Sequence, residues 1–143
     1  MNDARSAYTA AAVQTAGSAT VLTMLCDRLL LDVDRGRLAF EHGDVVVGRG
    51  HVQHAQDIVA ELMASLDVEA WEGGRMLMSV YAYIYSALVD ASVRADAEQL
   101  GECRGLVEPL VATWHEAAAL TAVEPSAPVP VPAAAGAGLL GVG

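Results

Sequence analysis

The sequence contains no lysine and only seven aromatic residues. All eight basic residues are arginines, spread between Arg5 and Arg104 without forming a cluster, and the net charge is −10. Nucleic acids and anionic membrane surfaces are recognised by basic patches. We therefore expect neither to be a partner of this protein.

Long hydrophobic runs are also missing, although 54% of the residues are hydrophobic. No run approaches the roughly 18 apolar residues that indicate a membrane span, because polar residues interrupt the alanine and valine that supply much of the apolar content. The N-terminal residues lack a basic segment followed by an apolar core, which is the pattern of a secretory signal. The composition therefore predicts a cytoplasmic protein without membrane insertion.

Motifs for catalysis and metal binding are absent as well. The two cysteines, Cys26 and Cys103, have no metal-ligand spacing, and no glutamate stands three residues before a histidine, as a di-iron bundle requires. There is no Gly-x-Ser-x-Gly sequence, and Gly73-Gly74 is not followed by the Lys-Ser/Thr of a phosphate-binding loop. We predict no enzyme activity, no cofactor and no metal, and two reduced cysteines in the core.

Hydrophobic periodicity is strong, and it is clearest between Ala55 and Asp67. At 100° per residue, the apolar side chains of this stretch fall within an arc of roughly 140°, which is typical of an amphipathic helix. They are Ile58, Val59, Leu62, Met63 and Leu66. Similar patterns predict helices over residues 19–42, 45–66, 75–95 and 97–119. Four such helices with short turns predict an all-α fold, an antiparallel up-down four-helix bundle.

Two terminal segments flank the predicted bundle, which we assign to residues 18–119. Residues 1–17 are alanine-rich, with a short helix expected over 6–13 and a stop at Gly17-Ser18. Residues 120–143 are rich in proline, alanine and glycine without apolar periodicity, so we expect a disordered tail. Pro109 is expected to kink or break the last helix, because proline lacks the N–H that a helix needs.

More apolar surface is present than one bundle core requires. The apolar positions of the predicted helix 75–95 cover roughly 200° of its surface, whereas a surface helix needs little more than 100°. Met24, Leu31 and Leu38 form a second stripe behind the core face of the first helix. This excess predicts either deep burial of helix 75–95 or an interface, namely a groove for an amphipathic segment or a homodimer contact.

Two histidines suggest a different function. His51 and His54 lie one turn apart on the second helix, and some helical bundles are phosphotransfer modules with an exposed reactive histidine. Such sites usually place a lysine near the histidine, and this chain has none. A phosphotransfer module and a dimeric helical scaffold without a client remain as alternatives to a client-binding protein.

With the helices placed at these residues, the sequence resembles the flagellar export chaperones of the FliS family over residues 7–114. The block that fits best does so in order and without gaps, at Ala55, Ile58, Glu61-Leu62 and Ser65-Leu66-Asp67. Other matches extend over the remaining helices: Ala7-Tyr8, Gln14, Met24-Leu25, Asp27, Gly43-Asp44, Gly73-Gly74, Leu77, Tyr81, Tyr83, Leu88, Ala91, Leu100 and Trp114. Leu31 and Leu38 depart from the family pattern, which is often polar at these positions.

The resemblance implies a cytosolic, non-enzymatic chaperone. Such proteins bind the disordered C-terminal region of flagellin, prevent its premature polymerisation and assist its delivery to the flagellar export apparatus. In the family, an N-terminal segment that carries a tyrosine packs over the bundle and contributes to client binding, and by residue match that role falls to Tyr8.

We expect the other client contacts along the edges of the second and third helices, at Val59, Met63, Met78, Tyr81, Tyr85 and Val89. The expected partners are the C-terminal segment of flagellin and a component of the export gate. Homodimerisation is the rival use of the same surface.

Overall fold

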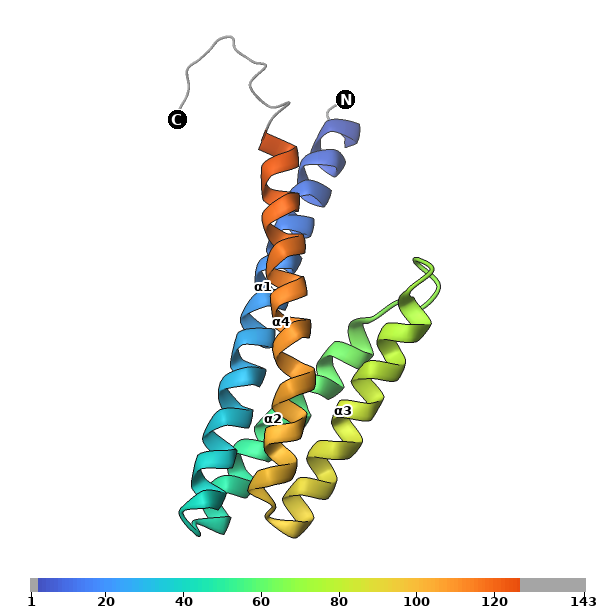
Figure 1. The fold of residues 1–143 in the computed structure, drawn as a ribbon. Helices are drawn as coiled ribbons and strands as arrows, with labels where there is room; N and C mark the ends of the chain where they lie inside the picture. Colours follow the sequence, from blue (N-terminus) through green and yellow to red (C-terminus); the bar gives the residue numbers. More distant parts are fainter. Residues whose placement is uncertain (1–2, 127–143) are drawn as a thin grey trace.

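The computed structural model describes the backbone of residues 3–126 and the side chains of residues 19–120. These residues form four helices and no strand: α1 (Asp3–Glu41), α2 (Val45–Ser65), α3 (Gly74–Arg94) and α4 (Ala97–Ser126). Each helix packs against the next one along the chain, and α4 closes the ring by packing against α1 (Figure 1). The prediction of an all-α four-helix bundle is confirmed.

The core is built from the helix faces that the periodicity predicted. The aliphatic core side chains that are 2% exposed or less come from all four helices: Leu29, Val33, Val52, Val59, Leu62, Ile84, Leu88, Leu100 and Val107. Burying such a side chain contributes roughly 1.5–3 kcal/mol. The shared core therefore holds the four helices together, since most helical stability in proteins comes from packing of an apolar face.

Two aspartates cap the N-termini of α2 and α4. The Asp44 carboxylate accepts a hydrogen bond from the backbone N–H of Val47 at 3.4 Å and caps α2. The Asp96 carboxylate accepts from the N–H groups of Glu98 and Gln99 at 3.0 and 3.2 Å, so it satisfies two donors that the first turn of α4 leaves free. These caps start α2 and α4 directly after short turns.

Helices α1 and α2 approach each other closely at Gly48. This close approach explains a glycine that would otherwise only weaken α2. A Cβ atom added at Gly48 would lie 2.4 Å from the ring of Phe40, and one added at Gly36 would lie 2.9 Å from the Val52 side chain. Glycine costs roughly 1 kcal/mol in a helix. At Gly48 that cost permits Phe40 to pack against the backbone of α2.

Helix α1 runs without interruption across Gly17 and Ser18, so the predicted stop there is wrong. One glycine costs only about 1 kcal/mol relative to alanine, and the alanine-rich residues on its N-terminal side favour the helix. The predicted helix over 6–13 is therefore part of α1. The expected boundary between an N-terminal segment and the bundle does not coincide with the end of a helix.

Helix α4 likewise continues through Pro109 to Ser126, so a break at the proline is also wrong. Pro109 is exposed, and the residue four positions earlier, Gly105, has no Cβ and faces open space. Proline removes one helical hydrogen bond and crowds the carbonyl of the residue four positions earlier, and α4 bears this cost without ending. The predicted tail overlaps α4 up to Ser126, and residues 127–143 lie outside the described part of the chain.

The four helices differ in length, and this difference shapes one end of the molecule. Helices α1 and α4 run side by side past the ends of α2 and α3 (Figure 1). The loop between α2 and α3 lies at the level where this two-helix extension begins. At that end, the bundle changes from four helices to two.

Helix α3 is long and apolar enough to cross a membrane by length and composition, with a mean hydropathy of 1.3. Core helices of soluble proteins meet the same criterion. Here Tyr81, Ile84, Leu88 and Ala91 of α3 are buried in the bundle core. Burial among the other helices accounts for this face of α3.

Candidate functional site

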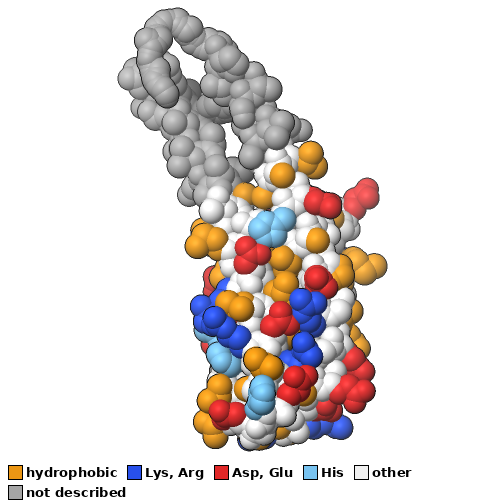
Figure 2. Space-filling model, turned by 60° about the vertical axis from the view of Figure 1, so that its left-hand side comes forward, with side chains coloured by type: hydrophobic (Ala, Val, Ile, Leu, Met, Phe, Trp, Pro, Cys, Tyr) orange, Lys and Arg blue, Asp and Glu red, His pale blue; other side chains and the backbone are white. Residues whose placement is uncertain are grey.

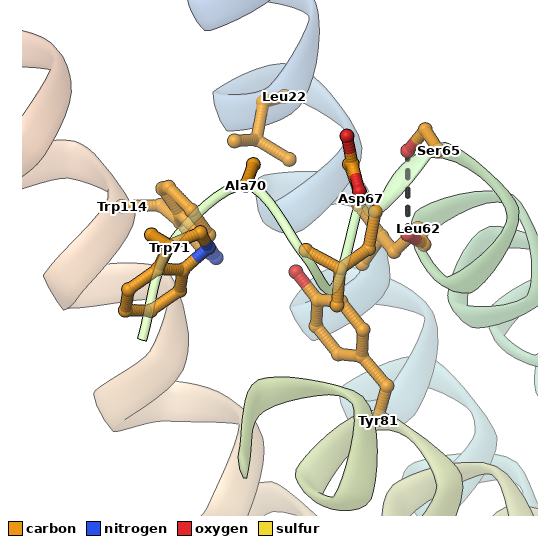
Figure 3. A pocket seen from close by; sticks show the side chains of 9 residues that line it. Leu22, Leu62, Ser65, Asp67, Ala70, Trp71, Tyr81 and Trp114 are labelled. Atoms are coloured by element: carbon orange, nitrogen blue, oxygen red, sulfur yellow. Dashed lines mark hydrogen bonds between the residues drawn. The ribbon is translucent and has the colours of Figure 1, made fainter. Parts of the chain in front are cut away.

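A pocket of about 220 Å³ opens at the end of the bundle where α2 ends and α3 begins (Figure 3). We call it the bundle-end pocket and define it by the residues that line it: Leu22, Leu62, Ser65, Leu66, Asp67, Ala70, Trp71, Tyr81 and Trp114. All four helices and the α2–α3 loop contribute to it. Small-molecule sites usually enclose roughly 300–1,000 Å³. The bundle-end pocket is smaller, so it suits one or two side chains of a polypeptide.

Both tryptophans of the chain line this pocket. Trp71 is 53% exposed, and its ring packs on Gly73, where an added Cβ would lie 2.0 Å from a ring carbon. The indole N–H of Trp114 is buried and forms no hydrogen bond with any described residue. A buried donor without a partner costs roughly 1–3 kcal/mol. An acceptor supplied by a bound segment, such as a peptide carbonyl, would remove this cost.

Tyr81 lines the same pocket from α3 and is 2% exposed. Burial raises the pKa of Tyr81 to about 12, and the neighbouring Cys26 thiol adds to this effect, whereas the indole N–H of Trp114 acts in the opposite direction. The Trp114 N–H is thus near the Tyr81 hydroxyl, but its geometry falls short of a hydrogen bond. Tyr81 therefore presents a neutral phenol beside a free indole donor.

A second apolar row lies beside the buried face of α3. We call it the α3 strip and define it by Met78, Tyr85 and Val89, all of which are half-buried. Tyr85 packs against the core, and Val93 at the end of the row is 69% exposed. On another side of the helix Met76 is 70% exposed. Helix α3 thus carries more apolar surface than the core covers, as its composition predicted.

The remaining predicted contact residues lie in different settings. Val59 is fully buried, and Met63 is half-buried against the core. Tyr8 belongs to α1, roughly 21 Å along the helix axis from Leu22, and its side chain lies outside the described residues. Of the seven predicted residues, Tyr81 lines the bundle-end pocket. Their role in client binding stays a prediction.

Sequence reasoning missed Leu22, Trp71 and Trp114 as pocket residues, because the pocket depends on how four helices meet. Trp71 did carry a signal. It stands in a turn rich in acidic residues and glycine, where no core stripe accounts for a tryptophan. An isolated large aromatic residue in a polar turn is worth testing as a contact residue.

The second stripe of α1 is exposed, as the sequence predicted. Met24 is 64% exposed, Leu31 is 41% exposed and Leu38 is 55% exposed. On the face obtained by turning the left-hand side of Figure 1 forward, hydrophobic side chains are interspersed with acidic, basic and histidine side chains (Figure 2). This face therefore lacks the continuous apolar patch that is typical of a strong protein interface.

The buried carboxylate of Asp32 joins α1 to α2 near His51 and His54. Asp32 is fully buried and accepts a hydrogen bond from Nε of Arg28 at 3.1 Å. Its other oxygen is hydrogen-bonded to Nδ1 of His54, and Nδ1 of His51 lies 4.0 Å from Oδ1. This arrangement gives both histidines a structural role at the α1–α2 contact. The phosphotransfer hypothesis for them stays a prediction.

The two cysteines are free and buried, as predicted. Burial raises the pKa of Cys26 to about 11, with a smaller contribution from Asp27, and burial raises that of Cys103 to about 11, with a smaller contribution from Glu102. Both thiols are therefore protonated at neutral pH and poor nucleophiles. Within the described residues, no group of three or more His, Cys, Asp and Glu side chains is placed to hold a metal ion.

Two comparisons with known proteins agree with this architecture. Residues 1–121 match the sequence model of the family described as "Flagellar protein FliS". The chain is also 32% identical over 109 residues to the flagellar secretion chaperone FliS of Salmonella typhimurium, an alignment that covers 73% of this chain and 79% of that protein. The match includes all four helices up to residue 121, so the chain belongs to the FliS family of flagellar secretion chaperones.

Proposed function

We propose that this protein is a cytosolic chaperone that binds the disordered C-terminal region of flagellin, prevents its premature polymerisation and assists its delivery to the flagellar export apparatus. The observation that carries the proposal is apolar surface that the fold leaves open in a member of a chaperone family. This surface comprises the bundle-end pocket and the α3 strip. A component of the export gate is the second partner that we propose.

A disordered segment is a suitable client for such a surface. It can lay an amphipathic helix along the α3 strip and insert a side chain into the bundle-end pocket. The client loses conformational entropy when it becomes ordered, so the affinity per unit of buried area is modest. Modest affinity permits release when the client is exported.

The predicted contact residues take different parts in this proposal. Met78, Tyr85 and Val89 offer half-exposed apolar surface, and Met63 on α2 is half-buried against the core. Tyr81 lines the pocket from α3. Val59 is fully buried and acts through the packing of α2. Tyr8, on the extension of α1, is the proposed contact outside the four-helix region.

The direct test is a calorimetric titration with the C-terminal segment of flagellin from the same organism. We expect a saturable complex at tens of micromolar or tighter, and no heat at those concentrations would reject the proposal. The variants Met78→Glu and Met76→Glu form a matched pair, since both introduce the same charge on α3. Met78→Glu is expected to weaken binding about tenfold or more, which corresponds to about 1.4 kcal/mol, whereas Met76→Glu leaves the affinity unchanged.

Circular dichroism and sedimentation complete the experiment. Unchanged helicity in both variants shows that lost binding reflects the surface and not unfolding. If Met78→Glu unfolds the bundle, then Met78 serves the fold and the α3 strip is not a client surface. If the free protein is a dimer that Met78→Glu dissociates, the strip is a homodimer interface instead.

A further inference from the structure

The bundle-end pocket has room for side chains that a segment of this chain can supply. Residues 127–143 follow directly on α4, contain no charged residue and end in Leu139-Leu140-Gly-Val-Gly. They lie beyond residue 121, where the family match stops. We propose that Leu139 and Leu140 dock into the bundle-end pocket of the same molecule, so that the C-terminal segment is an intramolecular occupant of the site.

The length of the segment selects the leucine pair. Ser126, the last residue of α4, lies roughly 18 Å along the helix axis from Trp114. A flexible chain from Ser126 to Leu139 has a root-mean-square span of about 20 Å and a maximum of about 45 Å, so Leu139 can return to the pocket. Val131 is less suitable, because five residues of extended polyproline II span only about 16 Å, less than this axial distance.

The chemistry of the pocket matches such a segment. Its walls include the apolar side chains of Leu22, Leu62 and Leu66, and its volume of about 220 Å³ suits one or two aliphatic side chains. The buried indole N–H of Trp114 lacks an acceptor. A glycine- and proline-rich segment forms few internal hydrogen bonds, so it brings free carbonyl groups along with its leucines.

Charge favours this occupant over an acidic one. The chain has a net charge of −10, and Asp67 lies at the lining of the pocket. A segment without charged side chains meets less repulsion from these carboxylates than an acidic peptide would. The tether also supplies an effective concentration of the order of millimolar, which lets a weak contact of two leucines be populated.

The consequence concerns access to the site. While the segment is docked, a client side chain cannot enter the bundle-end pocket, and the apparent affinity for the client falls in proportion to the time the pocket is free. This consequence rests on the proposed function. The docking itself does not, because it can be measured without flagellin.

Intrinsic fluorescence gives a specific measurement, since Trp71 and Trp114 are the only tryptophans and both line the pocket. The test compares the full-length protein with the double variant Leu139→Asp/Leu140→Asp. We expect the variant to show a red-shifted emission maximum and stronger quenching by acrylamide, because water replaces the leucines. The matched control is Val129→Asp/Val131→Asp, which adds the same charge to the same segment at positions less suited to reach the pocket.

Four outcomes decide the question. A change confined to the leucine variant, independent of protein concentration, supports the proposal. No change in either variant overturns it, and so does an equal change in both variants. A change that vanishes on dilution, together with a dimer in sedimentation, shows that the segment of a second copy fills the pocket and overturns the intramolecular docking.

A third variant, Trp114→Phe in the full-length chain, tests the hydrogen bond and leaves Trp71 as the single reporter. If the indole N–H holds the segment, the leucine substitutions change Trp71 emission less in this background. An undiminished effect removes Trp114 from the proposed contact. Far-ultraviolet circular dichroism of every variant confirms that the bundle remains folded.

Discussion

The buried carboxylate of Asp32 yields the sharpest stability prediction. Asp32 is fully buried and accepts hydrogen bonds from Arg28 and His54, so it links two turns of α1 to α2. In Asp32→Asn the side chain keeps its size but loses its charge. Each hydrogen bond to a charged group is worth roughly 1.5–3 kcal/mol, against about 0.5–1.5 kcal/mol for a neutral one. The two weakened bonds predict a loss of about 2 kcal/mol.

A matched control is present on the same helix. Arg37 and Glu41 form an i,i+4 ion pair at 3.0 Å, close to the 3.1 Å of Arg28 and Asp32, but the Glu41 side chain is 46% exposed. Exposed pairs of this kind contribute about 0.3–0.5 kcal/mol. Glu41→Gln should therefore change stability by no more than about 0.5 kcal/mol. Both substitutions weaken an i,i+4 pair with arginine, but Asp32 is buried and also bonds to His54.

The assay is urea unfolding followed by circular dichroism at 222 nm. For a protein of this size, 2 kcal/mol corresponds to a melting temperature lower by roughly 8 °C. A double-mutant cycle of Asp32→Asn with His54→Gln should show a coupling above about 0.5 kcal/mol, because the two groups are in contact. Equal losses for Asp32→Asn and Glu41→Gln would refute the reasoning, and so would a stabilised Asp32→Leu variant, since the carboxylate would then cost more than its partners return.

Three further predictions concern the C-terminal end of α3 and the core thiols. Ala95 ends α3 in the left-handed region with φ 52°, so Ala95→Gly should raise the free energy of unfolding by about 0.5–1 kcal/mol in urea titrations, and a loss would contradict this. The Arg49 guanidinium donates to two carbonyls of the last turn of α3 at 2.9 and 3.0 Å, so Arg49→Met should lower the unfolding free energy by about 1 kcal/mol. The pKa values of Cys26 and Cys103 rise from 9.0 to about 11 on folding, so their stabilising contribution is complete below pH 9 and is lost between pH 9 and 11. Urea titrations across that range should show falling stability, with a smaller slope in Cys26→Ala.

Local sequence patterns predicted much of the fold, because each pattern depends on the residues of a single helix. The periodicity of Ala55–Asp67 identified the buried face of α2. The errors came from residues that commonly end helices. We predicted breaks at Gly17 and Pro109, but α1 and α4 continue through them. The alanine-rich residues before Gly17 favour the helix and offset the cost of the glycine.

The candidate site was less predictable, because it belongs to no single helix. Asp32 lies on the flank of α1, and whether such a flank is buried depends on the neighbouring helix, which periodicity does not reveal. The bundle-end pocket needs Leu22, Tyr81 and Trp114 from three helices that meet only after folding. The excess of apolar residues in α3 was visible in the sequence, but the side of the helix that it leaves open was not.

The ring of helices also has a consequence for the order of folding. Helix α1 packs against α2 and against α4, and the contact between Arg104 and Asp34 joins residues 70 positions apart. Such a distant pairing costs more chain entropy than a pairing of neighbouring helices. During synthesis the side of α1 that receives α4 stays uncovered until the last helix emerges. A newly synthesised chaperone with this fold therefore exposes apolar surface of the kind that it is proposed to shield in its client.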